Sequence, residues 1–247
     1  MRFFTGLHQP SDARHFDAAF VSVNRLRPRV APMPAREWIM DSGAFTEIST
    51  HGRYRTSVAD YAAEIRRWAT NGSGRLLAAV SQDWMCEPFI VEKTGLSVLE
   101  HQRLTIERYD ALCAEDCAGV YVMPVLQGFA PDDYARHVAM YGDRLAHGQW
   151  VGVGSVCKRN GAPRQVAAVL LAIKTARPDL KLHGFGLKTT ALADPLVRAQ
   201  LETADSMAWS FHARKNGRSA NDWREALRWT AAIAARPVQQ LLDLCAA

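Results

Sequence analysis

Features that mark several common protein classes are missing from this chain of 247 residues. No apolar run approaches the roughly 20 residues that a membrane-spanning helix needs, and the first six residues are too short and mixed for a secretion signal. The five cysteines are odd in number and lack the spacing of a disulfide framework, which is typical of a reducing compartment. We therefore expect a cytoplasmic protein that does not associate with membranes.

Motifs for common cofactors are absent as well. Nothing resembles the Gly-x-Gly-x-x-Gly turn of dinucleotide-binding domains or the phosphate-binding loop of P-loop enzymes. Cys113 and Cys117 lie one helical turn apart, but no nearby histidine or cysteine completes the four ligands of a zinc site. We expect no metal and no organic cofactor. The net charge of +5 suits a polyanionic partner without identifying one.

What the chain does contain is apolar sequence arranged in alternating strand and helix patterns. Because 48% of its residues are hydrophobic, it can bury a large core. Eight apolar runs read as strands, at residues 3–7, 19–23, 38–41, 76–81, 120–126, 150–155, 182–186 and 206–210. Pro124 weakens the fifth of these, since proline cannot donate to a strand ladder.

Amphipathic patterns predict helices between the later strands. They cover residues 57–69, 97–113, a segment starting at Pro131, 162–176, 194–201, and 220–244 with a break near Pro237. Eight strands alternating with helices predict a (β/α)₈ barrel of the TIM type, with residues 1–247 forming one α/β domain. An open, doubly wound sheet is the alternative.

Polar residues stand where the predicted strands end. The run Trp-Ile-Met at 38–40 stops abruptly at Asp41, Ser42 and Gly43, and Asp83 and Gln127 follow two later strands. In a (β/α)₈ barrel the carboxyl ends of the strands meet at one mouth, where the chemistry takes place. Each residue, taken alone, also fits a plain turn or loop cap. Together they predict a site for a flat polar ligand such as a purine base.

The same strand ends suggest a division of roles. Asp205 lies beside the last predicted strand, and Phe45 or Trp209 is available to stack on the face of a base. Two carboxylates can act as nucleophile at a sugar carbon and as general acid or base. His183 is interpreted as a structural neighbour, because no second histidine stands at metal spacing.

Several of these motifs, in this order, resemble those of the tRNA-guanine transglycosylase superfamily. They are Asp-Ser-Gly-Ala-Phe at 41–45, Asp83, Leu-Gln-Gly at 126–128, Trp-Val-Gly-Val-Gly at 150–154 and Arg-Lys-Asn-Gly-Arg at 214–218. That superfamily has a modified (β/α)₈ barrel and exchanges guanine for a 7-deazaguanine. The run Gly-Val-Gly-Ser-Val-Cys-Lys-Arg at 152–159 is most similar to the DpdA branch, which modifies DNA.

The chain departs from the tRNA enzymes at two places. Their Cys-x-Cys-x-x-Cys zinc subdomain is missing, which favours DNA over tRNA as the substrate. Their nucleophile motif, Asp-Met-Phe-Asp-Cys, becomes Asp-Ser-Met-Ala-Trp at 205–209, so ungapped alignment puts Ala208 at the usual nucleophile position. We interpret Asp205 as the nucleophile, with another carboxylate as the alternative.

The resemblance implies a pentosyltransferase that exchanges guanine in DNA for a preQ0-like base through a covalent aspartyl–glycosyl intermediate. The implied catalytic residues are Asp41 and Asp205. The implied base-binding residues are Ser42, Phe45, Asp83, Gln127, Gly128, Gly152, Val153, Gly154, Phe185, Gly186 and Trp209. The implied nucleic-acid-binding residues are Lys158, Arg159, Lys188, Arg214, Lys215 and Arg218.

By the same resemblance, Asp83 accepts hydrogens from N1 and N2 of the base, and Gln127 with the backbone of residues 152–154 reads O6. The partners are DNA with a flipped or single-stranded guanosine, a free 7-deazaguanine base, and helper proteins. Three alternatives remain open. They are a tRNA-guanine transglycosylase, a catalytically silent barrel that binds nucleic acid within a complex, and an unrelated barrel hydrolase or lyase.

Overall fold

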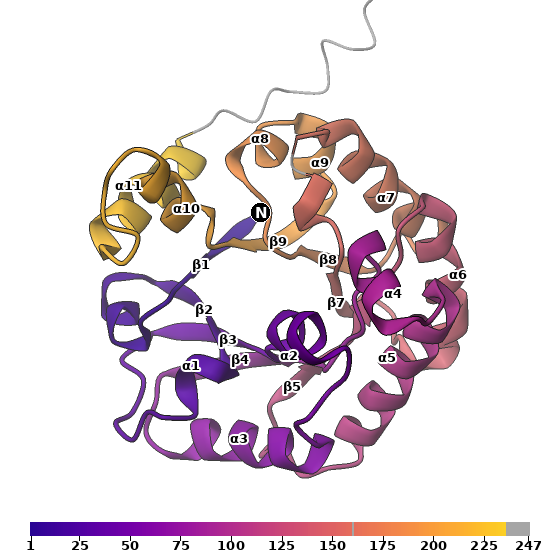
Figure 1. The fold of residues 1–247 in the computed structure, drawn as a ribbon, viewed down its shortest axis with the longest axis horizontal. Helices are drawn as coiled ribbons and strands as arrows, with labels where there is room; N and C mark the ends of the chain where they lie inside the picture. Colours follow the sequence, from indigo (N-terminus) through magenta and orange to yellow (C-terminus); the bar gives the residue numbers. More distant parts are fainter. Residues whose placement is uncertain (160, 236–247) are drawn as a thin grey trace, which may run out of the picture.

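Parallel strands form a barrel surrounded by helices in the computed structural model, which describes residues 1–159 and 161–235 (Figure 1). The strands are β1 (Arg2–Gly6), β2 (Ala18–Ser22), β3 (Glu37–Asp41), β4 (Arg75–Val80), β5 (Tyr121–Met123), β6 (Val125–Leu126), β7 (Trp150–Val153), β8 (Lys181–Gly184) and β9 (Leu201–Ser206). All pairs between neighbouring strands are parallel. The predicted (β/α)₈ barrel is confirmed.

The barrel closes through one strand that Pro124 divides in two. The sheet order β5-β4-β3-β2-β1-β9-β8-β7-β6 leaves β5 and β6 at its two ends. These two strands are consecutive in the chain, with β5 paired to β4 and β6 paired to β7. Because proline has no amide hydrogen, the ladder breaks at Pro124 and the strand changes partner there. The fifth predicted strand thus exists as two short pieces.

Helices follow most strands and cover the outside of the barrel. They are α1 (Val23–Leu26), α2 (Ala44–His51), α3 (Val58–Thr70), α4 (Pro88–Thr94), α5 (Val98–Cys113), α6 (Pro131–Tyr141), α7 (Pro163–Ala176), α8 (Thr189–Leu192), α9 (Pro195–Arg198), α10 (Ala208–Lys215) and α11 (Trp223–Ala234), with 3₁₀ turns η1 (Pro10–His15), η2 (Gly142–Arg144) and η3 (Cys157–Arg159). None of these helices is long and apolar enough to cross a membrane.

Local sequence explains where several helices begin. Ser97 caps α5 by accepting from the Glu100 amide at 3.2 Å, while the Glu100 carboxylate accepts from the Ser97 amide at 2.7 Å. Ser57 caps α3 by accepting from the Asp60 amide at 3.0 Å. These caps lie at the starts of two helices that the sequence predicts.

The sequence prediction is wrong at the end of the chain. Residues 206–210 do not form the last strand, which is β9 instead, and the helix predicted over 194–201 stops at Arg198. The apolar residues Trp209 and Ala213 are spaced for one face of a helix, and both are buried in α10. The last predicted helix is observed as α11, and its predicted part from residue 236 onward, with Pro237 and Cys245, lies outside the described residues.

Alternate residues of each strand point into the barrel or out toward the helices. Phe4, Ile39, Ala78, Val80 and Met123 pack together as one cluster, while their strand neighbours pack in two separate clusters with helix residues. Since both faces are covered, the strands read as continuous apolar runs. The same period of two makes Asp41, two residues after Ile39, project into the barrel at the carboxyl end of β3.

Two helices lie over this carboxyl end of the barrel. α2 starts three residues after β3 and occupies the middle of the ring in Figure 1, and α4 follows the loop after β4. They pack through Ile48, Trp84 and Ile90, in a small cluster that is separate from the barrel core. The mouth is therefore covered in part, which encloses the side chains that project into it.

Gly152→Ala tests how tightly the inside of the barrel is packed around the Phe185 ring. A methyl group at this position meets the Phe185 ring at 2.3 Å, so the ring or the strand must shift. Overpacking of this kind costs about 1–3 kcal/mol of unfolding free energy, measured by urea denaturation. Gly161→Ala is the control, because its methyl group meets open space. Equal stability of the two variants would contradict this packing.

Candidate active site

A cavity of about 180 Å³ lies inside the carboxyl end of the barrel. It is smaller than the roughly 300–1,000 Å³ of drug-sized pockets and much larger than the roughly 30 Å³ of one water, so its scale suits a single heterocycle. Its lining residues are Asp41, Ala44, Phe45, Val80, Asp83, Met85, Glu87, Gln127, Gly154, Ser155, Cys157, Phe185 and Gly186. The carboxylates of Asp41, Asp83 and Glu87 therefore face one small space. Asp205 is not part of this lining, but it bonds to the amide of Gly186, which is.

Asp41 ends β3 with its carboxylate held by two neighbours. Its Oδ2 accepts from the Gly43 amide at 3.1 Å, and the Ser22 hydroxyl on the adjacent strand also binds it. Burial, with a smaller contribution from the nearby charge of Asp205, raises the pKa of Asp41 to about 6 in spite of those hydrogen bonds. Gly43 is required here, because its φ of 74° is left-handed and a side chain would meet Asn24 at 2.5 Å.

Asp83 and Gln127 form a buried pair on the neighbouring strand ends. The Gln127 side-chain N–H donates to Asp83 Oδ2, and the side-chain oxygen Oε1 of Gln127 lies 2.7 Å from the Ser155 hydroxyl. Burial raises the pKa of Asp83 to about 7, in spite of the bond from Gln127 and with a further contribution from the charge of Asp41. Asp41 therefore interacts electrostatically with both of the other acids.

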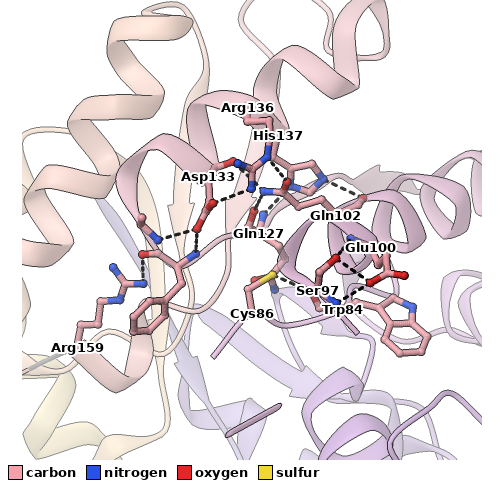
Figure 2. A network of polar contacts seen from close by, with 12 residues as sticks. Trp84, Cys86, Ser97, Glu100, Gln102, Gln127, Asp133, Arg136, His137 and Arg159 are labelled. Atoms are coloured by element: carbon pink, nitrogen blue, oxygen red, sulfur yellow. Dashed lines mark hydrogen bonds and ion pairs between the residues drawn. The ribbon is translucent and has the colours of Figure 1, made fainter. Parts of the chain in front are cut away.

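A network behind the cavity fixes Gln127 in place (Figure 2). The Gln127 backbone N–H donates to His137 Nδ1 at 2.8 Å, and the Gln102 side-chain amide donates to the Gln127 backbone carbonyl at 2.7 Å. Burial lowers the pKa of His137 to about 3, so this imidazole stays neutral and can accept through Nδ1. Because every partner is itself buried, the orientation of Gln127 is set before any ligand binds.

Asp205 is the last inward-facing residue of β9 and ends a chain of hydrogen bonds. The Trp150 indole donates to Thr203 Oγ1 at 2.7 Å, and Thr203 Oγ1 lies 2.8 Å from His183 Nδ1. His183 Nε2 lies 3.2 Å from Asp205 Oδ1. Since a carboxylate only accepts, the consistent arrangement has Nε2 donating to Asp205 and Nδ1 accepting from Thr203.

The Gly186 amide donates to the same Asp205 oxygen at 3.1 Å. Two donors on Oδ1 orient the carboxylate, and its other oxygen is then the one suited to attack a sugar carbon. His183 thus contacts an implied catalytic residue, whereas the sequence predicts only a structural neighbour. The sequence signal for this contact is the period of two along β8, which points His183 toward the same side as Phe185, the residue directly after the strand.

Residues that the sequence reasoning missed complete the cavity wall. Glu87 is buried four positions after Asp83, and Ser155 directly follows Gly154. The Ser155 hydroxyl accepts from the Cys86 amide at 2.8 Å and lies 2.9 Å from Glu87. Ser155 adopts a φ of 54°, a left-handed conformation that a non-glycine residue holds only where its surroundings enforce it. Cys157 also lines the cavity, and burial raises the pKa of its thiol to about 11.

Some implied base-binding residues lie outside the cavity lining. Trp209 is buried in the helix layer, where its indole donates to the Gly6 carbonyl at 2.7 Å, so it is not placed to stack on a base there. Val153 points outward into the helix-facing cluster, and Ser42 is buried beyond the lining. Gly128 leaves room for side chains of α6, since a methyl group there would meet Asp133 Cβ at 2.6 Å.

Gly152 in β7 and Gly154, which directly follows this strand, serve packing more than recognition of a ligand. The Gly152 amide donates to the Pro124 carbonyl at 2.8 Å, and the Gly154 amide donates to the Leu126 carbonyl at 3.0 Å. Both amides are therefore engaged in the strand ladder. Gly152 leaves room for the Phe185 ring and Gly154 leaves room for the Gln127 side chain. Their effect on the site is to let these two side chains enter it.

Basic residues lie beside exposed aromatic rings of α2 and α10. Lys158 lies 5.4 Å from the Phe45 ring centre, and Lys188 lies 5.8 Å from Phe211 on α10. Arg214 also faces Phe211, at 5.7 Å, and Lys215 beside it is exposed. Arg218 differs from them, because it forms an ion pair with Glu225 at 3.1 Å.

No metal centre is evident in the part of the chain that the structure describes. Within residues 1–159 and 161–235, no three side chains of histidine, cysteine, aspartate or glutamate come together as a metal ion would need. Asp41, Asp83 and Asp205 are instead held by hydrogen-bond donors from the protein. That arrangement suits a ligand that brings its own donors.

Comparison with known proteins places these residues in a family. A family model described as DpdA, DeoxyPurine in DNA protein A, matches residues 1–239. The match therefore includes the whole cavity lining and the chain from Trp150 to Asp205. A search of curated proteins gave no match.

Asp83→Asn tests the burial of this carboxyl through stability. Because folding raises the pKa of Asp83 from 3.8 to about 7, wild-type stability falls as pH rises between these values. We expect the variant to exceed the wild type by about 1–3 kcal/mol at pH 8 and to match it below about pH 4. Urea unfolding across this pH range measures the difference.

Asp179→Asn is the matched control of opposite sign. The Arg177 guanidinium lowers the pKa of Asp179, so its contribution to stability is present at neutral pH and lost on acidification. This variant should be less stable than the wild type at pH 8. If Asp83→Asn behaved in the same way, the carboxyl would not be destabilised by burial.

Proposed function

The chain belongs to the DpdA family, and on that premise we propose that it exchanges guanine in DNA for a free 7-deazaguanine base. The family implies a transglycosylase-type enzyme with a role in the 7-deazaguanine modification of DNA. One observation carries the finer proposal. Asp41 is electrostatically coupled to Asp83 and to Asp205 at a cavity the size of one heterocycle.

Asp83 and Gln127 recognise the base in this proposal. Asp83 accepts hydrogens from N1 and the exocyclic amine of guanine, and its raised pKa falls when these donors arrive. Gln127 has a second amide hydrogen beyond the one that binds Asp83, and this hydrogen reads O6. Phe45 and Phe185 contact the faces of the base from two sides of the mouth. The amides of Gly152 and Gly154 take no part, because the strand ladder uses them.

The first half of the exchange removes guanine. The target nucleotide leaves the stack, because its glycosidic carbon is not reachable inside a duplex. A carboxylate oxygen of Asp205 forms a bond to C1′ while the bond from C1′ to N9 breaks. The electron pair goes to N9, which takes a proton from the neutral form of Asp41. Guanine leaves, and the deoxyribose stays attached to Asp205 as an ester.

The second half runs in the opposite direction with another base. The incoming 7-deazaguanine loses its N9 proton to the Asp41 carboxylate, and N9 bonds to C1′. The ester bond to Asp205 breaks and its electron pair returns to the carboxylate. Asp41 therefore alternates between acid and base, for which a pKa of about 6 is suited near neutral pH. The exchange is balanced without an oxidant, a reductant or water.

Asp205→Asn and Asp41→Asn test these roles separately. With DNA and a labelled base, Asp205→Asn should form no covalent adduct and should lose exchange by at least about 10³-fold, since the amide is a poor nucleophile. Asp41→Asn should slow exchange by about 10²–10⁴-fold, the usual effect of general acid–base catalysis. Denaturing gels detect the adduct, and nucleoside mass spectrometry measures the exchange.

Asp17→Asn, at an exposed site, is the control and should match the wild type. Exchange by Asp205→Asn at the wild-type rate would remove Asp205 from the proposed role. If the wild-type protein released no guanine from DNA, even with partner proteins added, the base-exchange proposal itself would fail.

Thr203→Val tests whether the chain of hydrogen bonds positions Asp205. The substitution keeps the shape of the side chain but removes the hydroxyl between Trp150 and His183. We expect adduct formation to slow by about 10-fold, while the affinity for free base stays the same because Asp83 is untouched. An unchanged rate of adduct formation, with the fold intact, would show that His183 does not orient Asp205.

A further inference from the structure

A second hollow, of about 540 Å³, lies next to the base cavity. Its lining residues are Glu87, Pro88, Phe89, Phe129, Lys158, Arg159, Gly161, Ala162 and Gln165. Glu87 also lines the base cavity, so the two spaces adjoin. The lining comes from the end of the loop after β4 with the start of α4, from the loop after β6, from the turn η3 after β7, and from the start of α7 with the two residues before it.

Two exposed aromatic rings face this hollow. Phe89 on α4 is 44% exposed, and Phe129 before α6 is 42% exposed. A cationic side chain lies over each ring. Lys158 Nζ is 5.7 Å from the centre of the Phe89 ring, and Arg159 Cζ is 4.2 Å from that of the Phe129 ring. Single exposed apolar side chains are common on protein surfaces, but two aromatic rings that share one hollow indicate a binding surface.

The Phe129 side of the hollow is held rigidly. The Asp133 carboxylate accepts from the amides of Phe129 and Ala130 at 2.9 and 2.8 Å, and Arg136 pairs with the same carboxylate (Figure 2). The Arg159 guanidinium donates to the Phe129 carbonyl, which joins this loop to η3. A ligand that binds between the rings therefore meets a preformed surface and need not order it.

The charge of the hollow suits an anion beside a flat apolar group. Lys158 and Arg159 are both on its rim, and α7 begins at Pro163 next to them with the positive end of its helix dipole. Glu87, the acidic residue of this lining, turns toward the Ser155 hydroxyl at 2.9 Å on the base-cavity side. A nucleotide has both parts, a base for the rings and a phosphate for the cations.

We infer that this hollow binds the nucleotide adjacent to the target guanosine in an unpaired stretch of DNA. Its base lies between Phe89 and Phe129, and its phosphate contacts Lys158 and Arg159. The inference rests on the proposed function, because it takes the target guanine to occupy the adjoining cavity. It goes further by requiring that at least two successive nucleotides leave the duplex. Stacking on an aromatic ring offsets part of the cost of unstacking the second one.

A double-mutant cycle between DNA and protein tests this inference through binding alone. The probe is a fluorescent single-stranded oligonucleotide with one guanine, compared with strands that carry an abasic site immediately 5′ or 3′ of it. An abasic site on one of the two sides should weaken binding by about 5–100-fold, the range for one stacked base. Phe89→Ala should weaken binding of the intact strand by a similar factor and should no longer distinguish the abasic strand.

Matched variants separate stacking from other effects. Phe89→Leu keeps an apolar side chain without the ring and should also lose most of the discrimination. Leu171→Ala removes an exposed apolar side chain of α7 outside this hollow and should behave like the wild type. Phe129→Ala provides an independent test of the second ring.

Several outcomes would overturn the inference. These are equal affinity of the wild type for intact and both abasic strands, additive losses in the cycle, tighter binding of the fully paired duplex, tighter binding of RNA of the same sequence, or no binding of any strand. The binding assay measures no turnover, so its result is independent of catalysis, and guanine release is measured separately. If the protein discriminates between the strands but releases no guanine, the inferred nucleotide site is supported and the proposed exchange is contradicted. If it releases guanine but does not discriminate, the exchange is supported and the nucleotide site is contradicted.

Discussion

Three carboxylates that share the end of one closed barrel set the conditions for the rest of this structure. Asp41 lies near Asp83 and Asp205, and burial makes each negative charge costly. Hydrogen bonds from Gly43, Gln127 and Gly186 offset part of that cost. The part of the burial cost that these bonds do not offset raises the pKa of Asp41 to about 6 and that of Asp83 to about 7. A ligand rich in hydrogen-bond donors relieves this imbalance.

Much of the surrounding structure holds those donors in place. His137 and Gln102 fix the Gln127 backbone, and Gly154 leaves room for the Gln127 side chain. Ser155, in a left-handed conformation, binds the side-chain oxygen of Gln127. Such an arrangement keeps the polar groups aimed at the cavity without a ligand. Preorganised dipoles of this kind favour charge that develops during reaction, because they need not rotate when it appears.

Sequence reasoning gave the barrel and the acids but not the contacts between loops. The abrupt end of the apolar run at Asp41 located a strand end correctly, because a strand buried on both faces has a clear pattern. The strand that carries Asp205 was misplaced, since the apolar residues Ala208 and Trp209 belong to α10. Glu87 and Ser155 were missed, and the contact of His183 with Asp205 was not predicted, because these contacts depend on strands and loops far apart in sequence that meet only in the folded barrel.

The central claim is that Asp41 and Asp83 are coupled acids poised around one base, and carboxyl-carbon NMR tests it most directly. A pH titration of protein labelled at its aspartate carboxyl groups reports both pKa values, with and without saturating 7-deazaguanine base. The account predicts values near 6 and 7 in the free protein and a fall in the pKa of Asp83 when the base binds. Ordinary values near 4 for both residues, or a pKa of Asp83 that the bound base does not change, would contradict it.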